Sequence, residues 1–231
     1  LNMLDEAVAC YNEVINLDKG HIKSWYNKGV ILSGIGEHKQ AIECYVHVIE
    51  LNPSYVNAWY NQGLSFAELK ESEKAVECLD KVINLDGSYY KAWLKKGKLL
   101  EGMKRDQAAL LCYEEVIRIN GTDTDALLGK ARLLMSMNKQ QEALDCYDIV
   151  LKLNGQNIEA LLGRTQALNL LNRYTAALES CNELLTLNPD CADVWVCKGD
   201  ALSGMERYQE AITAYEKAGT LSIALIGKGL C

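Results

Sequence analysis

The sequence repeats itself every 34 residues, and this period constrains the fold more than any other feature. The segment from Ile22 to Tyr55 is followed without insertion by copies that begin at Val56, Tyr90, Thr124, Ile158 and Ala192. If the places are numbered from 1 at Ile22, place twenty is alanine in every copy and in a partial copy at the start of the chain: Ala7, Ala41, Ala75, Ala109, Ala143, Ala177 and Ala211. A unit of this length that recurs in phase predicts a stack of like structural units rather than a globule.

Each copy contains two blocks of apolar residues at helical spacing, separated by a polar break such as GIGEHKQ. This pattern predicts two amphipathic helices joined by a short turn. The second block ends in LNP, LDG, ING or LNG, where Asn or Asp followed by Gly or Pro stops a helix. A small residue at place eight and the alanine at place twenty predict that the two helices of a pair approach closely, with the aromatic residues at places four and twenty-four packed around that contact.

The best-formed copy has the pattern W-x2-x-G-x2-L, then A-x3-Y, then P, and this pattern resembles the tetratricopeptide repeat. Its residues are Trp25, Gly29, Leu32, Ala41, Tyr45 and Pro53. The chain departs from the family pattern at Leu127 and Leu161, which replace the tryptophan, and at Gly87, Gly121 and Gly155, where the family prefers proline. The resemblance implies an all-α fold, a right-handed α-solenoid of stacked antiparallel helix pairs, cut from a longer repeat array.

The period also predicts the domain organisation, which is a single solenoid domain over residues 1–231. The partial copy at the start supplies only a second helix, and the tail resembles the start of a further first helix, with Ala224, Leu225 and Gly229 at places three, four and eight. The predicted segments are 1–21, then repeats 22–55, 56–89, 90–123, 124–157, 158–191 and 192–221, then the tail 222–231.

Charge and cysteine placement exclude several functions. The net charge of -7 argues against a general attraction to nucleic acid or anionic lipid, and the apolar runs are too short to span a membrane. Five of the cysteines fall 34 residues apart, at Cys10, Cys44, Cys78, Cys112 and Cys146. Equivalent points on neighbouring helix pairs should lie roughly 10 Å apart, too far for a disulfide or a shared metal ion. We therefore expect apolar packing cysteines, no metal and a reducing, cytoplasmic location.

No catalytic site is predicted. The three histidines are scattered over a loop, an interhelical turn and a second helix, and no orienting group or oxyanion site accompanies Cys44 and His47. No phosphate-binding glycine loop occurs either. The sequence thus predicts a protein without enzymatic activity and without a cofactor.

The resemblance implies that the first helices line a concave groove, with places two, five, six and nine among those within reach of a ligand. These places are basic and rich in amides through the third repeat and acidic from the fourth. The carboxylate clamp of co-chaperone repeats would need Lys and Asn at places five and nine of the first repeat, where this chain has Tyr26 and Val30. The candidate peptide-binding residues are Asn27, Asn57, Asn61, Lys91, Lys95, Lys98 and Arg132.

The predicted function is a protein-interaction scaffold that binds a peptide or extended protein segment in this groove. Asparagine amides can hold a peptide backbone, and the lysines favour an acidic or phosphorylated segment. The simpler interpretation is that these are ordinary solvent-exposed helix faces. Two other hypotheses remain: head-to-tail self-assembly through unpaired terminal helices, with Leu4, Val8 and Tyr11 exposed at the first, and a substrate-recruiting arm of a larger enzyme.

Overall fold

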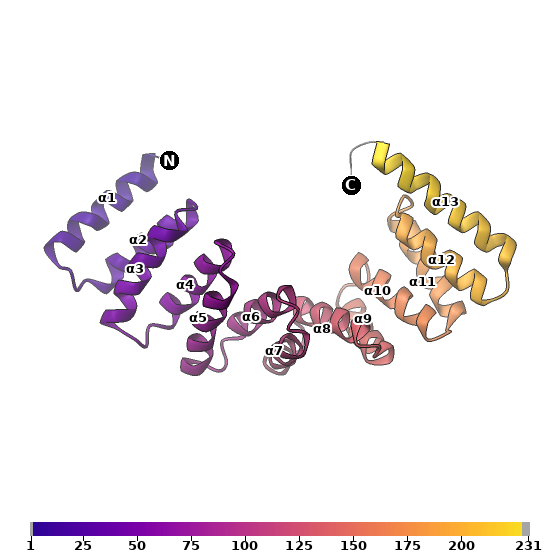
Figure 1. The fold of residues 1–231 in the computed structure, drawn as a ribbon, viewed down its shortest axis with the longest axis horizontal. Helices are drawn as coiled ribbons and strands as arrows, with labels where there is room; N and C mark the ends of the chain where they lie inside the picture. Colours follow the sequence, from indigo (N-terminus) through magenta and orange to yellow (C-terminus); the bar gives the residue numbers. More distant parts are fainter. Residues whose placement is uncertain (1, 228–231) are drawn as a thin grey trace. The chain divides into compact units, whose positions relative to one another are not determined.

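The computed structural model describes residues 2–227, which form helices α1 to α13 and no strand (Figure 1). The chain divides into two compact units, Leu1–Asn120 and Gly121–Cys231. The helices of the first unit are α1 Asn2–Leu17, α2 Ile22–Gly34, α3 His38–Leu51, α4 Val56–Glu68, α5 Ser72–Leu85, α6 Tyr90–Gly102 and α7 Asp106–Ile119. Those of the second are α8 Thr124–Ser136, α9 Gln140–Leu153, α10 Ile158–Leu170, α11 Tyr174–Leu187, α12 Ala192–Gly204 and α13 Tyr208–Gly227.

Each predicted repeat forms one helix pair. In the first unit α2 packs on α3, α4 on α5 and α6 on α7, and the second helices α3 and α5 also contact the following first helices, α4 and α6. In the second unit the pairs are α8 with α9, α10 with α11 and α12 with α13. The predicted all-α fold of consecutively packed helix pairs is confirmed.

The close approach predicted between places eight and twenty occurs. Ala41, Ala75 and Ala109 are fully buried. A Cβ added at Gly97 would lie 3.0 Å from Cε1 of Tyr113 and 3.2 Å from Cβ of Cys112, so the second helix occupies the space that any side chain at this place would need. Glycine is therefore favoured at residue 97 by packing rather than by backbone conformation.

The turn within each pair depends on one residue in the left-handed region. Gly36 has φ 88°, and the equivalent residues in the later copies are Lys70, Lys104, Asn138, Asn172 and Glu206, with φ between 57° and 63°. The next residue then donates its N–H to the carbonyl five residues back, as Arg105 does to Leu100 at 2.9 Å. This closes the first helix in the manner of a left-handed C-terminal cap.

The turn between pairs depends on the Asn or Asp that ends each second helix. The side chain of Asn52 accepts a hydrogen bond from the N–H of Ser54 at 3.1 Å, and Asp86 accepts from the N–H of Ser88 at 3.0 Å. The Asx side chain thereby stabilises the turn and keeps the helix from continuing.

The last helix lacks that stop. Residues 222 and 223 are Ser and Ile where the other copies have Asn or Asp with its turn, and the backbone of α13 continues without a break to Gly227. Residues 222–227 therefore extend the second helix of the sixth repeat and do not begin the separate first helix that was expected. The rest of that expected segment, 228–231, lies outside the described residues.

The cysteines pack as expected in the intact pairs. Cys44, Cys78 and Cys112 are buried, and the eight described cysteines are free thiols. Cys10 on α1 is the exception because it is exposed. Within residues 2–227 no group of three metal-ligating side chains comes together. None of the helices in this range combines the length and the apolar character needed to span a lipid bilayer.

Candidate functional site

The first helices of the first unit, α2, α4 and α6, carry six of the seven predicted groove residues. Asn27 lies on α2, Asn57 and Asn61 on α4, and the three lysines on α6. Asn27, Asn57 and Lys91 are exposed, whereas Asn61 and Lys95 are half-buried. The half-buried pair shows that this surface is not a uniformly solvated helix face.

Asn61 contacts the preceding repeat. Its Nδ2 donates a hydrogen bond of 3.0 Å to the hydroxyl of Tyr26 on α2. The ring of Tyr26 lies 5.1 Å from that of Tyr55, in the turn before α4. The amide and the two rings therefore form one cluster that joins the first helices of two successive repeats.

A second pair of tyrosine rings occurs one repeat later, but there the asparagine bonds the tyrosine of the turn instead of the tyrosine of the first helix. The rings of Tyr60 and Tyr89 also lie 5.1 Å apart, and the hydroxyl of Tyr89 donates to Oδ1 of Asn57 at 3.5 Å. One end of each of these asparagine amides is therefore engaged by a tyrosine. The ends left for a ligand are Oδ1 of Asn61, an acceptor, and Nδ2 of Asn57, a donor.

Tyr26 and Tyr60 stay neutral at physiological pH. Burial raises the pKa of Tyr26 above its usual value, and the neighbouring Tyr55 adds to the effect. Burial likewise raises the pKa of Tyr60. The cluster therefore presents aromatic faces and neutral hydroxyls rather than additional charge.

Lys91 lies at the rim of an open pocket of about 260 Å³. The pocket is formed by the turn between α5 and α6, and its other lining residues are Asp86, Ser88, Tyr89 and Tyr90. Tyr89 belongs to the tyrosine–asparagine cluster as well, so the pocket is continuous with it. A ligand in this pocket would meet an aromatic wall, the Lys91 ammonium and the Asp86 carboxylate, which accepts hydrogen bonds from Ser88.

Lys91 and Lys95 are one helical turn apart on α6. In the described part of the chain no hydrogen bond or ion pair joins either ammonium to another side chain. Lys96, by contrast, forms an ion pair of 2.5 Å with Asp80 and lies over the Trp93 ring at 5.5 Å, so it serves the packing between repeats. Two uncompensated like charges at this spacing oppose helix formation slightly.

Arg132, the seventh predicted residue, belongs to the second unit. It lies on α8 and forms an ion pair with Glu159 on α10. The pair links the first helices of the fourth and fifth repeats, so Arg132 serves contact between repeats in the second unit. Further along, Asp193 and Asp200 are exposed on α12, as the predicted change to an acidic surface requires.

The four tyrosines were not among the predicted site residues. Tyr26 and Tyr60 both occupy place five, and Tyr55 and Tyr89 both occupy place thirty-four. The same period that located the asparagines would have located them, but Tyr26 was considered only as a departure from a clamp pattern. Their role depends on contacts between repeats, which the pattern within one repeat does not show.

The repeat pattern is matched by known family models along most of the chain. Models described as tetratricopeptide repeat match residues 22–55, 56–89, 90–123, 128–192 and 192–222. The chain belongs to the tetratricopeptide repeat family. This membership supports a general role as a protein-interaction scaffold, since the family is generally non-catalytic.

Solved tetratricopeptide repeat structures share this fold. YrrB, described as having an unusual peptide-binding site, superposes with a TM-score of 0.71 at 19% identity over 80% of this chain and 95% of its own. A repeat protein from Parabacteroides merdae gives 0.64 at 16% identity over 94% and 86%, and MamA gives 0.62 at 23% identity over 64% and 87%. These likenesses show the solenoid fold alone. No curated protein matches the sequence.

Proposed function

We propose that the first unit of this tetratricopeptide repeat protein binds an acidic or phosphorylated peptide segment across α2, α4 and α6. The observation that carries the proposal is the pair Lys91 and Lys95, which have no anionic partner in the described structure and lie beside the tyrosine–asparagine cluster. An anionic side chain would offset the repulsion between the two ammonium groups. Lys98, one turn further along α6, extends the same basic surface.

The cluster supplies the part of binding that does not depend on ligand charge. Tyr55 and Tyr89 present half-buried aromatic rings, and such rings are common anchors at peptide interfaces. Oδ1 of Asn61 and Nδ2 of Asn57 can bond a peptide N–H and a peptide carbonyl, respectively. Asn27 adds a third amide on the neighbouring helix α2. YrrB, which has a related fold, is described as binding peptide.

The test uses the full chain with two fluorescent octapeptides, one of glutamate and one of glutamine. We expect the glutamate peptide to bind at least tenfold more tightly at low salt, with an affinity that falls as salt rises. Reversing Lys91, Lys95 and Lys98 to glutamate should abolish that preference. A phosphoserine octapeptide tests whether phosphate replaces the carboxylates.

The matched control reverses Lys19, Lys39 and Lys81, which are exposed and lie off the first helices. It changes the net charge equally but should leave the affinity for glutamate peptide within about twofold of wild type, because distant exposed charges are screened. If both triple reversals weaken binding to the same extent, the attraction is a property of net charge and the proposed groove is wrong.

A second candidate function is self-association through α1, which packs on α2 but has no first helix of its own repeat in the described structure. Cys10 and Val14 are exposed on α1, and Val14 is 37% exposed, whereas the equivalent Val48 is fully buried by its own first helix. A first helix from a second copy would cover this face. Light scattering at increasing concentration should show assembly that Val14→Glu abolishes; a wild-type monomer at high micromolar concentration contradicts it.

A further inference from the structure

The tryptophan at place four forms a hydrogen bond with the backbone of the turn between repeats. In four copies its indole Nε1 donates to the carbonyl oxygen six residues earlier, at 2.9 to 3.0 Å. The donor and acceptor pairs are Trp25 with Lys19, Trp59 with Pro53, Trp93 with Gly87, and Trp195 with Pro189. The indole thus fills a space between the turn and the neighbouring helices and also satisfies a backbone acceptor.

A basic residue at place seven completes this arrangement. The ammonium groups of Lys28, Lys96 and Lys198 lie 5.4, 5.5 and 5.2 Å from the centroids of Trp25, Trp93 and Trp195. These distances are within the range of cation–π attraction. The site therefore has three recurring parts: an indole, a turn carbonyl and a cation over the ring.

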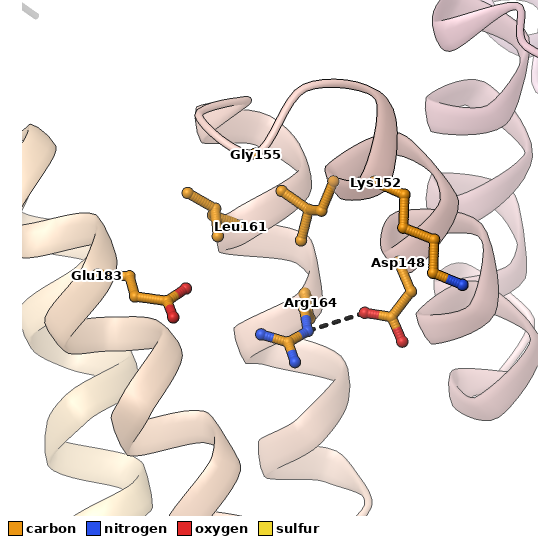
Figure 2. Close-up of a pocket in the computed structure, with 7 residues that line it drawn as sticks. Asp148, Lys152, Gly155, Leu161, Arg164 and Glu183 are labelled. Atoms are coloured by element: carbon orange, nitrogen blue, oxygen red, sulfur yellow. Dashed lines mark hydrogen bonds and ion pairs between the residues drawn. The ribbon is translucent and has the colours of Figure 1, made fainter.

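The fourth and fifth repeats both carry leucine in place of the indole, and in the fifth an open pocket adjoins the leucine. Leu161 stands at place four and is packed inward, with 2% of its surface exposed. Gly155 occupies the place of the acceptor, and its carbonyl has no hydrogen-bond donor among the residues that the structure describes. Arg164 occupies place seven. An open pocket of about 330 Å³ is lined by Leu161, Gly155 and Arg164, the residues at these three places (Figure 2).

Two hydrogen bonds hold the Arg164 guanidinium in place at the pocket. Arg164 donates from Nε to Oδ1 of Asp148 at 2.9 Å and from a terminal nitrogen to the hydroxyl of Ser180 at 2.7 Å. Figure 2 shows the dashed ion pair and the side chain of Glu183 reaching from α11 toward the pocket. Leu151 and Leu161 supply the apolar lining. All these residues belong to the second unit.

We propose that this pocket receives a tryptophan side chain from a partner polypeptide. The indole N–H would donate to the Gly155 carbonyl, the ring would lie against Leu151 and Leu161, and the Arg164 guanidinium would meet its π face. An aliphatic side chain satisfies only the second of these contacts. Tryptophan is enriched among the residues that dominate binding energy at interfaces. A pocket lined by leucines that offers the Gly155 carbonyl as a hydrogen-bond acceptor matches an indole, which has a single N–H donor. The site is in the second unit and is independent of the basic groove in the first.

The experiment titrates the full chain with acetyl-Gly-Trp-Gly-amide, following the ligand signals by NMR. We expect saturable binding at one site, and at least tenfold weaker binding of the peptide with leucine in place of tryptophan. The 1-methylindole side-chain analogue lacks the N–H and should bind about fivefold more weakly, as expected for the loss of one hydrogen bond. Free indole should bind no more tightly than the peptide.

Two variants test the location. Leu161→Trp fills the pocket from within, so the peptide should lose at least tenfold in affinity while thermal unfolding shows the chain still folded. Trp93→Leu should create a second site of the same kind in the third repeat. There Gly87, Asp80 and Lys96 occupy the places of Gly155, Asp148 and Arg164. This variant should bind a second equivalent of the peptide.

Three results would overturn the proposal. They are absence of saturable binding to the wild-type chain, unchanged binding by a folded Leu161→Trp variant, and binding of free indole without binding of the tripeptide. If Leu161→Trp fails to fold, the Trp93→Leu variant tests the proposal instead. If folded Trp93→Leu still binds only one equivalent of the peptide, the absence of an indole at place four does not create the binding site.

Discussion

The amide nitrogen of Asn61 lies 3.0 Å from the hydroxyl oxygen of Tyr26, in a hydrogen bond that joins the first helices of two successive repeats. Both side chains are half-buried, so neither is simply a solvated polar group. The bond fixes the position of the Tyr26 ring against Tyr55 and leaves the other end of the Asn61 amide for a ligand. Structural support and binding thus use opposite ends of one side chain.

Removing this hydrogen bond should destabilise the first unit. We expect Asn61→Ala and Tyr26→Phe each to lower the free energy of unfolding by about 1 kcal/mol, the usual net value for such a bond. In a double-mutant cycle measured by urea denaturation, the combined loss should be about 1 kcal/mol less than the sum, since both substitutions remove the same contact. Strict additivity would show that the pair contributes no coupling energy.

Replacing the glycine at place eight should overpack the helix pair. Gly97→Ala puts a methyl group 3.0 Å from the Tyr113 ring, and we expect a loss of about 1 to 3 kcal/mol in the free energy of unfolding. Gly34→Ala is the control because no atom lies within 4 Å of its added Cβ. It should be neutral or slightly stabilising, as alanine favours helix more than glycine. Equal effects of the two would contradict the packing role of Gly97.

Glycine should be preferred at the turn residue that follows each first helix. Lys104 has φ 59°, a conformation that costs an L-residue about 1 kcal/mol relative to glycine. Lys104→Gly should therefore raise the free energy of unfolding by up to about 1 kcal/mol. At the exposed mid-helix residue Lys81, the same change should lower it by about 1 kcal/mol. A decrease at both positions would mean that the left-handed conformation carries no strain.

Stability should fall at alkaline pH. Burial raises the pKa of Cys78 to about 12 and that of Cys112 to about 11, from an ordinary value of 9.0. The unfolded chain releases these thiol protons above pH 9 while the folded chain keeps them, so the free energy of unfolding should decrease as pH rises from 9 toward 12. Cys78→Ala should make this decrease shallower than it is in the wild-type chain. Urea denaturation at pH 8 to 11 measures both.

The period predicted the helix pairs and the close contact at places eight and twenty because these features recur within every copy. It did not predict which side chains hold the turns in place. Lys104 and Asn138 take the left-handed conformation that Gly36 takes, although no residue type marks the position. Tertiary packing of the two helices imposes this turn, and it overrides the local preference of lysine.

The sequence by itself determined that this protein is a stack of helix pairs, and that its polar first-helix places turn from basic to acidic along the chain. Only the tertiary structure decided what those side chains do. It paired Arg132 with Glu159, engaged Asn61 with Tyr26, and placed Arg164 in an ion pair with Asp148 at the pocket beside Gly155. These contacts join different helices, often in successive repeats. They depend on how the helices stack and on which residue fills each place, and a pattern within one repeat does not contain that information.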